Sequence, residues 1–116
     1  MQAIWIEIPV ADLDRARRFY ETVFRLDGTT VIEQDVRRIV VIEGEPNVSL
    51  NETPGFVPTA AGSLPYFHVD DLDAAISAVS AAGGTIAEAV TERPDLGRFA
   101  LVHDSEGNAL YLHGAA

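Results

Sequence analysis

The sequence predicts an α+β fold in which two βαβββ modules form an open, eight-stranded cupped sheet, with the helices on its convex face. The first observation is a repeat, because an apolar strand that leads into Asp-Leu-Asp occurs at residues 8–16 and again at 67–75. The second is element order, since strand, helix and three further strands can be read in each half. The third is length: a half of this chain alone would be only marginally able to fold, whereas two halves side by side give eight strands around one core.

The repeat also sets the expected domain organisation. We expect a single domain at residues 1–116, with module 1 at 1–52, a linker at 53–63 and module 2 at 64–116. A duplicated unit places equivalent positions around a pseudo-twofold axis, where a shared cavity can form.

The elements of the first module follow from side-chain periodicity and capping residues. Residues 3–9 alternate as a strand does, and Asp12 is a typical helix N-cap. The helix that follows is amphipathic and is expected to end at Asp27-Gly28. The remaining strands are predicted at 29–33, 37–43 and 47–52.

The second module repeats this pattern after the linker, which contains two prolines and two glycines. Asp71 caps its helix, and Gly83-Gly84 ends it. A loop is expected at 92–97 and a four-residue turn at 104–107, with Asp first and Gly last. Its strands are predicted at 64–69, 85–90, 98–103 and 108–113.

Composition excludes several classes of function. The formal net charge of −10 opposes binding to nucleic acid or to anionic membranes, which both require a positive patch. The chain has no cysteine, which rules out disulfides, thiolate metal ligands and a cysteine nucleophile. The first residues lack the basic and apolar regions of a signal peptide, and no apolar run is long enough to span a bilayer. We therefore expect a cytoplasmic protein.

The helix starts and the last turn have distinctive sequences: Val10–Ala16 with Phe19-Tyr20, Val69–Ala75, and Asp104–Asn108. Together they resemble the vicinal oxygen chelate superfamily, which includes lactoylglutathione lyases, extradiol dioxygenases and bleomycin-binding resistance proteins. The resemblance covers essentially the whole chain and is strongest to uncharacterised bacterial glyoxalase-like proteins. It implies a site on the concave face, and it implies pairing as a homodimer.

The resemblance also implies where a metal would bind. Catalytic members hold a divalent cation with His, Glu or Gln side chains from the first and last strands of each module. Transferring those positions by their spacing from the capping and turn aspartates gives Trp5, Leu64 and Tyr111, and approximately Ser49. None of these is a good ligand for such a cation. We therefore expect no metal at the usual position and no other cofactor.

Strand alternation separates the core from the concave face. The side chains assigned to the helix-packed core are Ile4, Ile6, Ile8, Val48, Leu50, Phe67, Val69, Leu110 and Leu112. The concave face then combines aromatic rings with a few polar groups, which suits a small organic ligand. Its candidate ligand-binding residues are Trp5, Ser49, Asn51, Leu64, Tyr66, Tyr111 and His113.

Glu7 and His68 are the candidate catalytic residues on this face. Glu7 interrupts an apolar strand, where it would act as a general base or accept a ligand hydrogen bond; the alternative is a structural ion pair. His68 can transfer protons near neutral pH, or it can be a structural histidine at a strand end. A displaced zinc or iron site made by Glu7, His68 and His113 is a further alternative.

Two functions remain open from the sequence. The first is metal-free binding of a small, partly aromatic molecule, as in the antibiotic-sequestering relatives. The second is a lyase or isomerase resembling glyoxalase, with Glu7 as general base and His68 or a displaced metal polarising a carbonyl.

Overall fold

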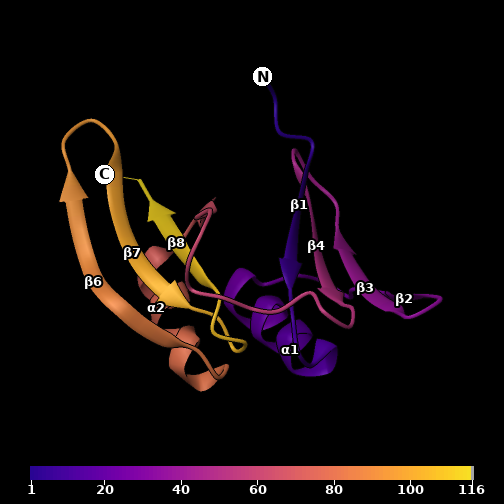
Figure 1. Ribbon diagram of the computed structural model, residues 1–116. Helices are drawn as coiled ribbons and strands as arrows, with labels where there is room; N and C mark the ends of the chain where they lie inside the picture. Colours follow the sequence, from indigo (N-terminus) through magenta and orange to yellow (C-terminus); the bar gives the residue numbers. More distant parts are fainter. Residues whose placement is uncertain (116) are drawn as a thin grey trace.

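The Asp-Leu-Asp repeat marks the start of both helices in the computed structural model, which describes residues 1–115 (Figure 1). Helix α1 spans Leu13–Phe24 and helix α2 spans Leu72–Ala81. The Asp12 carboxylate accepts the backbone N–H of Arg15 at 3.0 Å, and Asp71 accepts that of Ala74 at 3.0 Å. Each aspartate therefore satisfies one free amide of the first helical turn. Neither helix in this described part is long and apolar enough to cross a membrane.

The eight strands form two separate four-stranded sheets, one from each half of the chain. The first sheet has the order β1-β4-β3-β2 and the second the order β5-β8-β7-β6. The strands are β1 (Trp5–Pro9), β2 (Val31–Gln34), β3 (Arg37–Ile42), β4 (Asn47–Glu52), β5 (Tyr66–His68), β6 (Thr85–Arg93), β7 (Gly97–His103) and β8 (Ala109–Gly114). The α+β class and the two βαβββ modules are confirmed, with the eight strands divided between two sheets.

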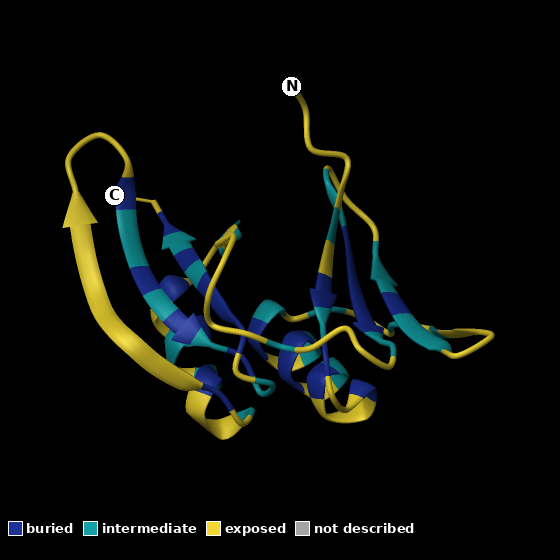
Figure 2. Ribbon diagram, viewed as in Figure 1, coloured by how far each residue is buried: buried dark blue, intermediate teal, exposed yellow. Residues whose placement is uncertain are grey.

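Burial shows which side of each sheet is packed. The core lies where the helices meet the two sheets, while β6 is exposed along its whole length (Figure 2). Most of the predicted core residues are buried in this core or are partly buried and packed against it. Ile4 was wrongly assigned to it: it is 74% exposed, because β1 begins only at Trp5. The predicted loop at 92–97 is also shorter than expected, since β6 continues to Arg93 and pairs there with Gly97.

The turn after β7 joins the two modules. Asp104, which is 3% exposed, accepts the hydroxyl of Tyr20 from α1 at 2.7 Å. The side chain of Asn108 donates to the carbonyl of Pro9 in β1 at 2.7 Å and to Asp104 at 3.0 Å. A turn that the sequence identifies only as local structure therefore connects the second sheet to the start of the first module.

Glu106 in the same turn binds the beginning of α1. Its Oε1 accepts the backbone N–H groups of Ala11 at 3.0 Å and Asp12 at 2.9 Å. The Arg15 guanidinium donates to both carboxylate oxygens, at 2.7 and 2.8 Å. Arg15 is thus half-exposed but bound across the module junction.

The same contacts shift the pKa values of this cluster. Burial raises the pKa of the Tyr20 hydroxyl well above its usual value, and the neighbouring Asp104 carboxylate adds to the effect. Burial also acts to raise the pKa of Glu106. Hydrogen bonds from Arg15 and the backbone of Asp12 outweigh it, so that the pKa of Glu106 lies below its usual value.

Replacing the Glu106 carboxylate tests this junction. We expect Glu106→Gln to lower the free energy of unfolding by about 2 kcal/mol at neutral pH, because charge-assisted hydrogen bonds are lost. Urea denaturation measures the change. Glu88→Gln is the matched control, because Glu88 lies on exposed β6, and it is expected to change stability by less than about 0.5 kcal/mol.

The pH dependence has a defined sign. Because the pKa of Glu106 is lowered by folding, its ionised form stabilises the folded state above its unfolded pKa, and this is lost as pH falls through the folded pKa. The difference in stability between the natural protein and Glu106→Gln should therefore shrink in acid. A difference that stays constant as the carboxylate is protonated would contradict this role.

Candidate functional site

Glu7 is the centre of a polar network on the face of the first sheet that points away from the helices. Its Oε1 accepts hydrogen bonds from Arg37 at 3.1 Å, Asn51 at 3.1 Å and Ser49 at 3.4 Å. The Trp5 indole N–H donates to Ser49 Oγ at 3.1 Å. Strand register explains the cluster, because Glu7 lies opposite Ser49 and two residues from Trp5 on the same face of β1.

The network is supported by two buried polar residues. Ser49 is 1% and Asn51 3% exposed, whereas the side chains of Glu7 and Arg37 are partly exposed above them. In the described residues every hydrogen bond to Glu7 ends on Oε1, which leaves Oε2 available at the surface. The predicted alternative of an ion pair is therefore present, since Arg37 contacts the carboxylate, and one carboxylate oxygen remains open to a ligand.

The corresponding face of the second sheet is aromatic. Tyr66 of β5 and Tyr111 of β8 stack with ring centroids 4.4 Å apart and 12° between the planes. Phe99 of β7 packs its ring against Tyr66 at 5.9 Å and 80°. The Arg93 guanidinium lies 5.4 Å from the centre of the Phe99 ring. These rings form a surface on which a planar molecule can stack.

Two histidines extend this surface. His68 Nδ1 lies 2.9 Å from His113 Nδ1, and His113 Nε2 lies 2.8 Å from the carbonyl oxygen of Leu96. A carbonyl only accepts, so His113 carries its proton on Nε2, and in neutral His113 Nδ1 accepts the proton of His68 Nδ1. Glycine is required at Gly97, where a Cβ would lie 2.7 Å from His113 Nε2 at a φ of +113°.

The predicted site residues therefore gather in two groups. Trp5, Glu7, Ser49 and Asn51 meet on the first sheet; Tyr66, His68, Tyr111 and His113 meet on the second, and Leu64 precedes β5 with 41% exposure. In the described residues no hydrogen bond or ring contact joins the groups, and no three His, Asp or Glu side chains lie close enough to hold a metal. The displaced set of Glu7, His68 and His113 is thus not assembled in this structure.

The usual metal position of the superfamily is also a poor fit. Trp5 and Ser49 hydrogen-bond to each other, and Tyr111 stacks on Tyr66. Leu64 carries no donor atom. An indole, a hydroxyl, a phenol and an isobutyl group do not form a set of ligands for a divalent cation.

Arg37, Phe99 and Arg93 are the contributors that the sequence interpretation missed. Strand alternation could have identified Phe99, because it lies on the same face of its predicted strand as His103. Arg37 had a weaker signal, since it starts a strand whose register with β4 is not visible in the sequence.

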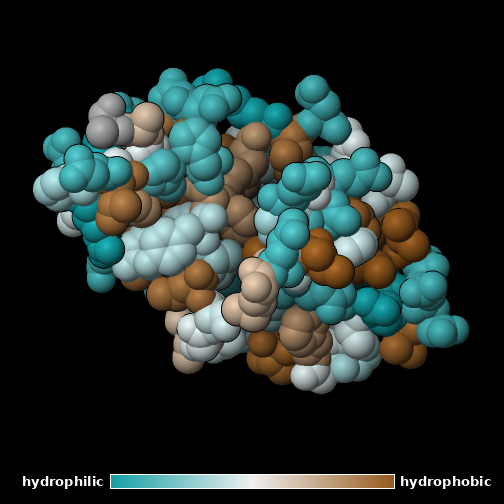
Figure 3. Space-filling model, turned by 90° about the horizontal axis from the view of Figure 1, so that it is seen from above, coloured by the Kyte–Doolittle hydropathy of each residue, from teal (hydrophilic) through white to brown (hydrophobic). Residues whose placement is uncertain are grey.

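The site is an open surface in the single chain. Trp5 is 49% and Tyr66 51% exposed. Seen from above, apolar side chains lie in the middle of the molecule and also reach its edge, with hydrophilic side chains between them (Figure 3). Four hollows of the described residues lie elsewhere, and His68 is the one predicted site residue that lines any of these four.

Comparison with known proteins agrees with the fold. Residues 2–112 match the model of the Glyoxalase/Bleomycin resistance protein/Dioxygenase superfamily. A glyoxylase-like domain-containing protein of Didymella fabae is 30% identical over 89% of this chain and 85% of its own length. A putative glyoxylase of Mycobacterium bovis, CFP32, is 31% identical over 90% of this chain, which spans only 40% of that relative.

Solved structures share the same fold at lower identity. A glyoxalase/bleomycin resistance protein from Albidiferax ferrireducens T118 superposes with a TM-score of 0.76 at 19% identity, covering 97% of this chain and 98% of that one. TnmS3, an antibiotic binding protein from Streptomyces sp. CB03234, gives 0.70 at 24% identity, covering 100% and 97%.

Proposed function

The chain belongs to the glyoxalase/bleomycin resistance protein/dioxygenase superfamily, and on that premise we propose that it binds a small, planar aromatic molecule on its concave face without a metal. The observation that carries the proposal is the open Oε2 of Glu7 beside the half-exposed ring of Trp5. A ring that packs on Trp5 brings its edge to this oxygen. The description of the Streptomyces relative as antibiotic binding is consistent with such a ligand.

The charge of the network defines the polar group of the ligand. Arg37 neutralises Glu7, and Asn51 and Ser49 occupy Oε1. This carboxylate is already paired, so binding a second cation would gain little, because that cation would also lose its hydration. A neutral donor adds a charge-assisted hydrogen bond without the cost of desolvating another charge. We therefore propose an aromatic ligand that carries an N–H or O–H group.

Catalysis by Glu7 and His68 is the alternative, as in a lyase or isomerase of the glyoxalase type. It requires a base and a polarising group that reach one substrate. Here Glu7 is bound within the first sheet and His68 is bound to His113 in the second. This separation supports binding over catalysis as the function.

Indole and N-methylindole form a matched pair of probes, because they differ only in the donor. We expect indole to bind about tenfold more tightly, since one hydrogen bond to a charged group is worth about 1.5 kcal/mol. Trp5 is the single tryptophan of the chain, so its indole N–H gives one assigned NMR signal that reports on binding. Saturable shifts of that signal on titration measure both affinities.

Glu7→Gln sharpens this test. In this variant Arg37, Asn51 and Ser49 hold the glutamine oxygen where Oε1 lies in the natural protein. The glutamine N–H₂ then takes the place of the open Oε2, so a hydrogen-bond acceptor is replaced by a donor. Indole should then bind no better than N-methylindole. Glu33→Gln is the control, because it removes a comparable ion pair with Arg38. Absence of binding by both probes contradicts the proposed function; equal binding to the natural protein contradicts only the role of Glu7.

Divalent ions test the metal-free part of the proposal. We expect protein purified without a histidine tag to keep the same melting temperature in Mg²⁺, Mn²⁺, Ni²⁺ or EDTA. The residues at the usual ligand positions have no suitable donors. A melting temperature that rises and saturates near one ion per chain would overturn this part.

We also propose that the protein acts as a homodimer in the cytoplasm. The half-exposed Trp5 and Tyr66, with the partly exposed Ile86 and Val90 of β6, leave apolar surface uncovered in one chain. Light scattering should give twice the 12.5 kDa mass of the chain. A mass of one chain at the highest soluble concentration would contradict dimer formation.

A further inference from the structure

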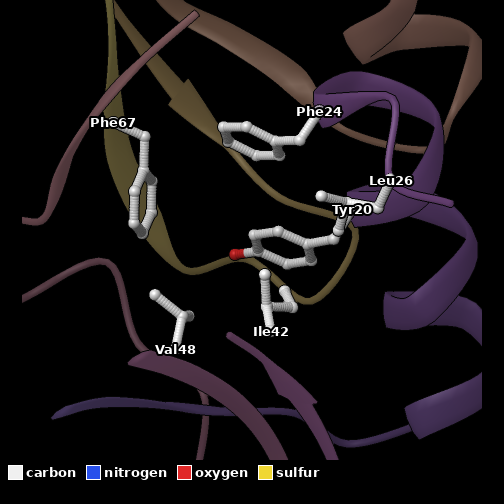
Figure 4. Close-up of a pocket in the computed structure, with 6 residues that line it drawn as sticks. All are labelled: Tyr20, Phe24, Leu26, Ile42, Val48 and Phe67. Atoms are coloured by element: carbon white, nitrogen blue, oxygen red, sulfur yellow. The ribbon is translucent and has the colours of Figure 1, made fainter. Parts of the chain in front are cut away.

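Six residues, most of them apolar, line a cavity between the first helix and the two sheets (Figure 4). Its volume is about 90 Å³. Phe67 alternates with Tyr66 and His68 along β5, and Val48 alternates with Ser49 along β4, so these side chains point toward the helices. The lining residues are Tyr20, Phe24, Leu26, Ile42, Val48 and Phe67.

Aromatic rings form one half of the cavity wall. Phe24 stacks on Tyr20 with centroids 5.7 Å apart and 7° between the planes. Phe67 meets Phe24 edge-on at 5.4 Å and 81°. The aliphatic side chains of β3 and β4 form the other half (Figure 4). A small guest ring would therefore find both ring faces and ring edges, the two arrangements that aromatic pairs prefer.

The cavity offers nothing to a polar guest. The hydroxyl of Tyr20 is the one polar side-chain atom among its lining residues, and it is bound to Asp104 at 2.7 Å. Four of its lining residues, Phe24, Leu26, Ile42 and Phe67, are only partly buried, so the cavity opens to solvent. Enclosed apolar cavities of roughly 150 Å³ bind benzene. Apolar atoms that enter recover the dispersion contacts that the lining lacks.

The surroundings limit the size of the guest. On one flank Phe24 also borders a hollow lined by the charged Arg25, Asp70 and Asp71. On the other flank Leu26 and Ile42 border a hollow with Asp27 and Glu43. Polar surface thus borders the apolar surface on both flanks. The apolar area is too small for a protein interface, which buries about 800 Å² per partner.

We propose that this cavity is a second binding site, which takes a small apolar molecule about the size of one benzene ring. It does not depend on the concave-face site, because the two lie on opposite faces of the sheets. Tyr20 and Phe24 come from the first module and Phe67 from the second. A bound guest therefore bridges the modules, and it stabilises the folded chain by an amount that grows with the logarithm of guest concentration above Kd.

Toluene is the probe for this site. Titration followed by methyl NMR should give saturable shifts of the Leu26, Ile42 and Val48 methyl groups, and the melting temperature should rise with toluene concentration. Ile42→Phe fills the cavity from β3 and should weaken toluene binding at least tenfold. Val41→Phe is the matched control, because Val41 is also partly exposed and points to the opposite face; its toluene affinity should be unchanged.

Each other outcome overturns the proposal. Shifts that never saturate show partitioning onto the surface instead of a site. Methyl shifts that follow protein concentration without toluene show that a second copy covers the cavity. If Ile42→Phe fails to fold, Val48→Ile, which adds one methyl group, should still weaken toluene binding, and unchanged affinity rejects the site. None of these results alters the indole measurements, so the two proposals fail separately.

Discussion

One carboxylate turn holds the two modules in their relative position. The Asp104 and Glu106 side chains, both on the turn after β7, bind Tyr20 in α1 and the amides at its start. The Asp12 amide is unpaired in any isolated helix, so the second module completes the start of α1. These hydrogen bonds act together with the packing of Phe24 on Phe67 to hold the two sheets in their orientation.

The concave face is organised in the same way, with buried polar groups beneath an exposed one. Ser49 and Asn51 hold Glu7 from below while Arg37 balances its charge. No partner in this network has to reorganise when a donor arrives at the open oxygen, so little ordering cost opposes binding. The second sheet contributes rings held by Tyr66–Tyr111 stacking and by the histidine pair.

The repeat made the fold accessible from the sequence, because both Asp-Leu-Asp segments bind helix-start amides as their residue types require. Alternation also placed Trp5, Glu7 and Ser49 on one face. It did not show that Arg37 reaches Glu7, or that Glu106 reaches Ala11, because such contacts depend on strand register and on how the modules pack. The assignment of Ile4 to the core was wrong for a local reason, since side-chain periodicity does not show at which residue a strand begins.

The position of Tyr20 limits how the apolar cavity can vary. Its ring forms part of the wall while its hydroxyl occupies Asp104, which also receives the Asn108 side chain. Exchanging the tyrosine for another residue to reshape the wall would leave a buried carboxylate short of a donor. Evolution or design can therefore tune the preferred guest through Phe24, Phe67 and the aliphatic residues of the wall, whereas Tyr20 stays fixed by its bond to Asp104.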